Sequence, residues 1–209
     1  MYFVLFFPGV YLSGFSGGEA VPFALLRELG RTLTYTIPSL TLLWYLITDK
    51  KGFGSLREIK PEKHDILTFA LGFPGLIIIS LFISLLAYLF SQKLGINPPP
   101  KIEGPETAAG YAILVFSCLG TGYLEESYFR YYLLARLESA IPLTALRIAL
   151  STLLFSLCHI YEGPWGILNA IMAGVLLSIF FIKWRSIHGI AWAHGAYNLF
   201  VYIMGNFGR

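Results

Sequence analysis

The stretch Glu125-Glu126-Ser127-Tyr128-Phe129-Arg130 decides how the rest of the chain must be organised. It follows an apolar run, residues 108–119, that is long enough to form most of a membrane span. A charged side chain near the middle of a bilayer costs roughly 2.5–3.5 kcal/mol even on lenient insertion scales, so such residues usually serve a function. The stretch predicts a polar site inside a membrane protein, and the alternative is that both acids lie at the membrane interface.

Helical geometry separates the two adjacent acids of this stretch. Glu126 and Arg130 stand four residues apart with the acid first, which favours an ion pair on one helix face. Glu125 points about 100° away from Glu126, because an α-helix has 3.6 residues per turn. We therefore expect Arg130 to neutralise Glu126 while Glu125 faces a different environment.

Composition indicates a membrane protein. Of 209 residues, 56% are hydrophobic and 13% are charged, against roughly 25% charged residues in soluble domains, and the mean hydropathy is +0.67. The expected fold is an all-α, polytopic integral membrane bundle of six to seven transmembrane helices. The net charge of +3 is spread over the loops, so no basic stripe indicates nucleic-acid binding. Cys118 and Cys158 lie in apolar runs and are expected to be buried free thiols.

The chain divides into an N-terminal part, residues 1–107, and a predicted catalytic core, residues 108–209. Residues 2–15 are apolar but short, contain Pro8-Gly9, and are neither a normal signal peptide nor a confident span. Residues 17–30 have an amphipathic pattern typical of an interfacial segment. Residues 32–48 and 66–90 are predicted spans, and Pro98-Pro99-Pro100 forms a stiff connector before the core.

Four closely spaced helices are predicted in the core: residues 108–137, 143–159, 165–184 and 187–204. The loops between them are short, so neighbouring helices should be antiparallel. Gly120 and Gly122 indicate a bend or a close helix approach just before the glutamates. Positive charge predicts the orientation, because a cytoplasmic loop 49–64 also brings Arg136, Arg147, Lys183 and Arg185 to the cytoplasmic side.

Three further polar residues of the core complete a candidate site. His159 ends one predicted helix, and His194 and Asn198 stand four apart on one face of the last. If each helix is unbroken, Glu125, His159 and His194 lie 11 to 12 residues from a cytoplasmic-side Arg or Lys, which is roughly 16–18 Å of helix. All three groups then share a level near the middle of a core about 30 Å thick.

Two chemistries suit these residues. A carboxylate beside a neutral imidazole can hold and deprotonate water, while a second imidazole and a carboxamide can stabilise the oxyanion of carbonyl hydrolysis. Alternatively, Glu125, His159 and His194 could bind zinc, with water as the fourth ligand. Ser127 and Cys158 face away from the neighbouring Glu125 and His159, which argues against a covalent nucleophile. A non-catalytic membrane adaptor or a proton-relay transporter is the other open class, although the chain has no internal repeat of the transporter kind.

Three ordered motifs resemble those of the CAAX-protease and bacteriocin-processing family. They are Glu125-Glu126…Arg130, Phe155…His159 and His194…Asn198, on successive predicted membrane helices. The family is described as glutamate intramembrane proteases, related to the endopeptidase that removes the terminal tripeptide from prenylated CAAX proteins. The resemblance implies that Glu125 is the general base, that His159 holds the water, and that His194 and Asn198 form the oxyanion hole. Glu126 and Arg130 would be structural.

The resemblance covers about residues 108–204 and leaves residues 1–107 without a motif. It implies a membrane-anchored peptide or protein substrate, cut near its C-terminus, for which a prenylated CAAX-like peptide is one candidate. It favours a site without metal or other cofactor, with zinc as the alternative. We expect a multi-pass protein of the plasma membrane whose active site is reached from the cytoplasm.

Overall fold

The computed structural model describes residues 2–6, 22–49, 60–96 and 102–206. In the N-terminal part, α1 (Tyr2–Leu5) is followed by a continuous rod made of α3 (Leu25–Arg31), the π-helix η1 (Thr32–Thr36) and α4 (Ile37–Asp49). The long helix α5 (Lys63–Leu94) comes next. These bounds contain both spans predicted for residues 32–48 and 66–90.

The predicted four-helix core is present with nearly the expected bounds. Its first helix is α6 (Ala108–Glu126), which continues as the π-helix η3 (Ser127–Leu134) and α7 (Ala135–Glu138). It is followed by α8 (Thr144–Leu157), the short 3₁₀ turn η4 (Ile160–Glu162), α9 (Gly163–Trp184) and α10 (Ile187–Asn206). The described residues form no β-strand, so the all-α prediction is confirmed.

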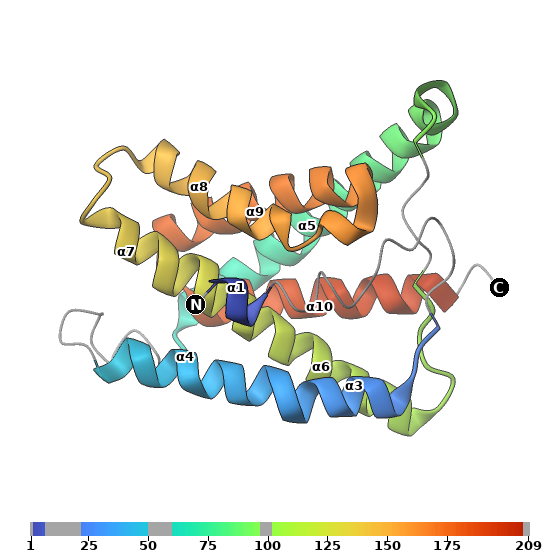
Figure 1. Cartoon of the computed structure of the whole chain (residues 1–209), viewed down its shortest axis with the longest axis horizontal. Coiled ribbons are helices and arrows are strands. Elements are labelled where there is room, and N and C mark those ends of the chain that lie inside the picture. Colours follow the sequence, from blue (N-terminus) through green and yellow to red (C-terminus); the bar gives the residue numbers. More distant parts are fainter. Residues whose placement is uncertain (1, 7–21, 50–59, 97–101, 207–209) are drawn as a thin grey trace.

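Helix α10 is the central element of the bundle (Figure 1). It packs along α6 on one side and α5 on the other, while α9 packs against both α8 and α5. The rod formed by α3, η1 and α4 lies against α6. The candidate site is therefore enclosed by the core helices and by a rod from the N-terminal part.

The outer surface of the bundle is apolar, as expected for a membrane protein. Along α5, Ile78, Leu81 and Leu85 are each more than half exposed, whereas the charged residues Glu126 and Arg130 are fully buried. Three helical stretches, residues 63–94, 108–138 and 160–184, are long and apolar enough to cross a bilayer. The protein is thus an integral membrane protein, and the total of six to seven spans stays a prediction.

Two assumptions behind the depth estimate need correction. Residues 127–134 are π-helical, and α8 ends at Leu157, so His159 lies beyond the helix. A uniform rise of 1.5 Å per residue therefore applies neither from Glu125 to Arg136 nor from Arg147 to His159. Gly189, in contrast, lies within an uninterrupted α10.

Three other expectations fall partly or wholly outside the described residues. They concern most of the first apolar stretch (residues 7–15), most of the basic loop (residues 50–59), and the triple-proline connector. The orientation based on that loop stays a prediction. Cys118 and Cys158 are both free, as expected, but only Cys118 is fully buried.

Candidate active site

A close contact between α6 and α10 brings the glutamate pair next to His194. A Cβ atom added to Gly122 would lie 2.6 Å from the carbonyl oxygen of Ala191, and one added to Gly195 would lie 3.0 Å from the carbonyl oxygen of Cys118. Only glycine allows the two backbones to approach this closely, as is common between membrane helices. The close approach expected at Gly122 is confirmed, and it requires no bend, because α6 runs unbroken to Glu126.

The Glu126–Arg130 ion pair is present and completely enclosed. Arg130 Nη1 donates to Glu126 Oε1 at 2.9 Å, and neither side chain is exposed. Arg130 Nη2 also donates to the carbonyl oxygen of Gly174 on α9, at 3.2 Å. The guanidinium lies 4.5 Å from the ring centroid of Phe155 on α8, within the range of a cation–π contact. Arg130 therefore joins three helices of the core at one point.

Glu126 also fixes the ring of His194, which sequence reasoning did not predict. His194 Nδ1 lies 2.7 Å from Glu126 Oε1, the oxygen that accepts from Arg130. Because an ionised carboxylate only accepts hydrogen bonds, Nδ1 carries a proton and donates it to this contact. The other nitrogen, Nε2, faces Glu125 Oε2 at 3.6 Å, beyond hydrogen-bond distance.

Glu125 has the separate environment that the helical geometry predicted. Its side chain is 16% exposed and lines a cavity, while that of Glu126 does not. Glu125 Oε2 is buried and accepts no hydrogen bond from a described residue. This oxygen is free to accept a proton from a molecule in the cavity.

His159 is oriented by the helix that precedes it. Its Nδ1 lies 3.0 Å from the carbonyl oxygen of Phe155, so Nδ1 is the donor and Nε2 keeps a lone pair. The Phe155 ring contacts both histidines, with centroid distances of 4.7 Å to His159 and 5.9 Å to His194. Phe155 therefore separates the two imidazoles and sets the tautomer of one of them.

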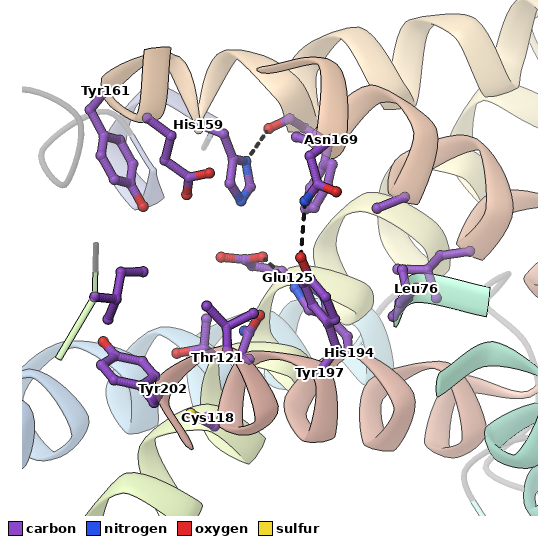
Figure 2. A pocket seen from close by; sticks show the side chains of 18 of the residues that line it. Leu76, Cys118, Thr121, Glu125, His159, Tyr161, Asn169, His194, Tyr197 and Tyr202 are labelled. Carbon is purple, nitrogen blue, oxygen red and sulfur yellow. Dashed lines mark hydrogen bonds and ion pairs between the residues drawn. The ribbon is translucent and has the colours of Figure 1, made fainter. Parts of the chain in front are cut away.

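Glu125, His159, His194 and Asn198 all line one cavity of about 200 Å³. Figure 2 shows His159 on the wall formed by the α8–α9 side of the bundle, facing Glu125 and His194 on the α6–α10 side. Asn198 lies one turn beyond His194 on α10. The cavity thus contains every residue predicted to be catalytic and excludes the two predicted to be structural.

Several residues of the cavity were not predicted from the sequence. They include Asn169, whose Nδ2 donates to the hydroxyl of Tyr197 at 3.1 Å, and Tyr161, Glu162 and Tyr202. Tyr197 and Glu162 stand three residues from His194 and His159, and this spacing could have indicated them. Arg31 also lines the cavity, but nothing in its local sequence connects it with the core motifs.

His64 and His188 take no part in this site, as expected. His188 Nδ1 lies 2.8 Å from the Tyr123 hydroxyl, and His64 lies 3.2 Å from Glu62 Oε2. Within the described residues, no three His, Cys, Asp or Glu side chains are close enough together to hold a metal ion. Glu125, His159 and His194 share the cavity but do not form such a cluster, and the metal dependence stays a prediction.

Comparison with known proteins finds a similarity in the core. No curated protein and no solved structure matches the chain. Residues 107–200 match the family model described as type II CAAX prenyl endopeptidase Rce1-like. The matched segment begins at the N-cap of α6 and contains all seven residues of the three motifs. Residues 107–200 are therefore similar to the Rce1-like type II CAAX prenyl endopeptidases, which are a family of proteases.

Proposed function

We propose that this protein is an intramembrane endopeptidase that hydrolyses a peptide bond near the C-terminus of a membrane-anchored substrate. The observation that carries the proposal is the single cavity lined by Glu125, His159, His194 and Asn198. A general base, a water-orienting imidazole and two oxyanion donors are sufficient for hydrolysis without a covalent intermediate. The family match supports a protease of the CAAX type.

In the proposed reaction, water bound in the cavity donates one hydrogen bond to Glu125 Oε2 and the other to His159 Nε2. Both atoms suit this role, because the first has no donor among the described residues and the second keeps its lone pair. Glu125 removes a proton as the water oxygen attacks the carbonyl carbon. The tetrahedral intermediate then breaks at the C–N bond, and protonated Glu125 returns the proton to the leaving amine.

His194 and the Nδ2 amide of Asn198 stabilise the oxyanion. Since the Nδ1 proton of His194 is donated to Glu126, the ring can donate from Nε2 only when it carries both protons. A carboxylate oxygen near each ring nitrogen favours that imidazolium form. The same arrangement gives Glu126 a positioning role toward His194, in addition to its ion pair with Arg130.

Cleavage assays with matched variants test the proposal. Purified protein in lipid nanodiscs would be incubated with S-farnesylated peptides of the Cys-a-a-X type and with a membrane proteome, and products identified by mass spectrometry. We expect Glu125→Gln, His159→Ala and His194→Ala to abolish cleavage while folding normally. Glu138→Gln and His188→Ala are matched controls outside the cavity and should retain it. Folded variants that leave every product unchanged would refute the enzyme hypothesis and favour a membrane adaptor.

A zinc-dependent hydrolase using Glu125, His159 and His194 is the second candidate. Its support is the chemistry of the residues, since a Glu and two His are an adequate zinc ligand set. It gives Asn198 no ligand role, although that residue lines the same cavity. We favour direct activation of water by Glu125, and elemental analysis of active protein decides between the two.

The substrate and location follow from the same proposal. A substrate reaching a cavity inside the bundle must itself be held at the membrane, and prenylated CAAX-like peptides are the candidate class that the family indicates. We further propose that the protein resides in the plasma membrane with the cavity reached from the cytoplasm. The positive charge of loop 49–64 and of the core helix ends supports this orientation.

A further inference from the structure

Arg31 lines the cavity, and the proposed mechanism does not use its positive charge. It ends α3 (Leu25–Arg31), far from the core in sequence and outside the family segment. Of the described residues that line the cavity, it is the only lysine or arginine. The acidic side chains on the same walls are Glu125 and Glu162, so an anion entering the cavity is repelled by these carboxylates and attracted by Arg31.

The guanidinium of Arg31 is held in place by buried partners. Its Nη2 donates to Glu28 Oε2 and to Ser117 Oγ, each at 2.8 Å. The Ser117 hydroxyl itself donates to Glu28 Oε2 at 2.9 Å, and both Glu28 and Ser117 are almost completely buried. This network ties α3 to α6 and restricts the orientation of the guanidinium.

Arg31 nevertheless has hydrogen-bond donors that can bind another ligand. Its side chain is 43% exposed, and both hydrogen bonds described for it come from Nη2, which leaves the Nε and Nη1 hydrogens available. Glu28 is also approached by Arg27, whose Nε lies 3.7 Å from Oε1. Two arginines therefore neighbour one glutamate, but only Arg31 lines the cavity.

The ligand that matches this site is a carboxylate. Arginine presents its N–H groups in a planar fork that fits a carboxylate. Ser117 precedes Cys118, which lines the cavity, and Figure 2 places Cys118 and Tyr202 on the side away from Leu76. Arg31 is close enough to Glu125 and Tyr202 to interact electrostatically with both. A chain with its scissile bond at Glu125 can thus extend its end toward Arg31.

We propose that Arg31 binds the C-terminal carboxylate of the substrate and so selects the peptide bond that is cut. This inference rests on the proposed endopeptidase function, in which cleavage occurs near a C-terminus. It explains how an enzyme without a covalent nucleophile distinguishes a chain end from an internal segment. An internal peptide bond brings no carboxylate to Arg31 and so lacks this additional contact.

The test compares two farnesylated Cys-a-a-X peptides that differ only at the last residue, one with a free carboxylate and one with a C-terminal amide. The wild-type protein should prefer the free acid by about 10- to 100-fold in kcat/KM, as expected for a charge-assisted contact in a partly exposed site. Arg31→Gln should reduce the acid-to-amide ratio of kcat/KM to near one, chiefly by raising KM for the acid peptide. Arg27→Gln is the matched control, because it lies on the same helix and also neighbours Glu28, and it should keep the preference.

A binding measurement separates failure of this inference from failure of the proposed function. Affinities of both peptides would be measured with Glu125→Gln protein, with and without Arg31→Gln, and Arg31→Lys would serve if Arg31→Gln does not fold. Binding that favours the acid peptide and depends on Arg31 supports the inference, even if no peptide is cleaved. The absence of cleavage would refute only the proposed endopeptidase function. Equal binding and cleavage of acid and amide by wild-type protein, or an acid preference that survives Arg31→Gln, would overturn the role of Arg31.

Discussion

The two adjacent glutamates should respond to mutation in opposite ways, and Glu126→Gln is the more informative substitution. It removes a negative charge from a site where neither Glu126 nor Arg130 has any exposed side chain. The guanidinium then keeps its contact with the Gly174 carbonyl but loses its only carboxylate partner among the described residues. Breaking a buried ion pair in this way costs about 3–5 kcal/mol of unfolding free energy.

That loss is measurable as thermal stability in detergent or nanodiscs. For a chain of this size, about 3–5 kcal/mol corresponds to a decrease in Tm of about 6–20 °C. Arg130→Met should give a similar loss. In the double variant Glu126→Leu/Arg130→Met, part of the stability should return, because apolar side chains often replace a buried ion pair without cost. Activity should not return, since His194 Nδ1 has then lost its acceptor.

Glu125→Gln is the matched comparison. None of the described residues donates a hydrogen bond to Glu125 Oε2, and Glu125 faces the cavity. The unfolding free energy should therefore change by no more than about 1 kcal/mol, while turnover is abolished. The reasoning is refuted if Glu126→Gln is as stable as the wild type. It is also refuted if both glutamine variants lose the same fraction of activity and neither loses stability.

Four further predictions concern packing, catalysis, metal and topology. Gly122→Ala should lower expression and activity, because its Cβ would lie 2.6 Å from the Ala191 carbonyl oxygen, whereas Gly30→Ala, with nothing within 4 Å of its Cβ, should be neutral in the same assays. Asn198→Ala should reduce kcat by roughly 10²–10³-fold with little change in KM, as measured by steady-state kinetics on the farnesylated peptide; an effect on KM alone would contradict an oxyanion role. Fully active protein should contain no stoichiometric zinc by elemental analysis and should withstand chelation, and activity lost to a chelator and restored by zinc would make His194 a ligand. Single cysteines introduced into residues 50–59 should be labelled by membrane-impermeant maleimide only from the cytoplasmic side, and labelling from outside would reverse the orientation.

Much of the fold was predictable because membrane helices leave a clear hydropathy signal. The four core helices begin and end close to the predicted residues, and the ion pair between Glu126 and Arg130 follows from four-residue spacing alone. Local geometry also predicted that Glu125 and Glu126 differ in environment. These features depend on residues that are neighbours along a single helix.

Features that depend on contacts between helices were not predictable in the same way. The π-helix Ser127–Leu134 has no distinct sequence signature, yet it lies directly after the glutamates, as such segments often do at functional sites. Nothing in the sequence indicated that Glu126 would accept from His194 on α10, or that Arg31 on α3 would reach the cavity. Such contacts arise from the packing of segments more than 60 residues apart.

The pairing of buried charges within single helices has a consequence for how the protein enters the membrane. Arg130 lies four residues after Glu126, and Arg31 three residues after Glu28, so each pair can form while its helix is still alone in the bilayer. Glu125 has no basic residue within one turn of its own helix, and the nearest cationic group is His194 on α10. During biogenesis, α6 therefore enters the membrane without a basic partner for Glu125 on its own helix. Glu125 gains a basic neighbour, His194, only after α10, the last helix of the core to be synthesised, has docked. The proposed active site is in this way completed only when the last core helix has packed against α6.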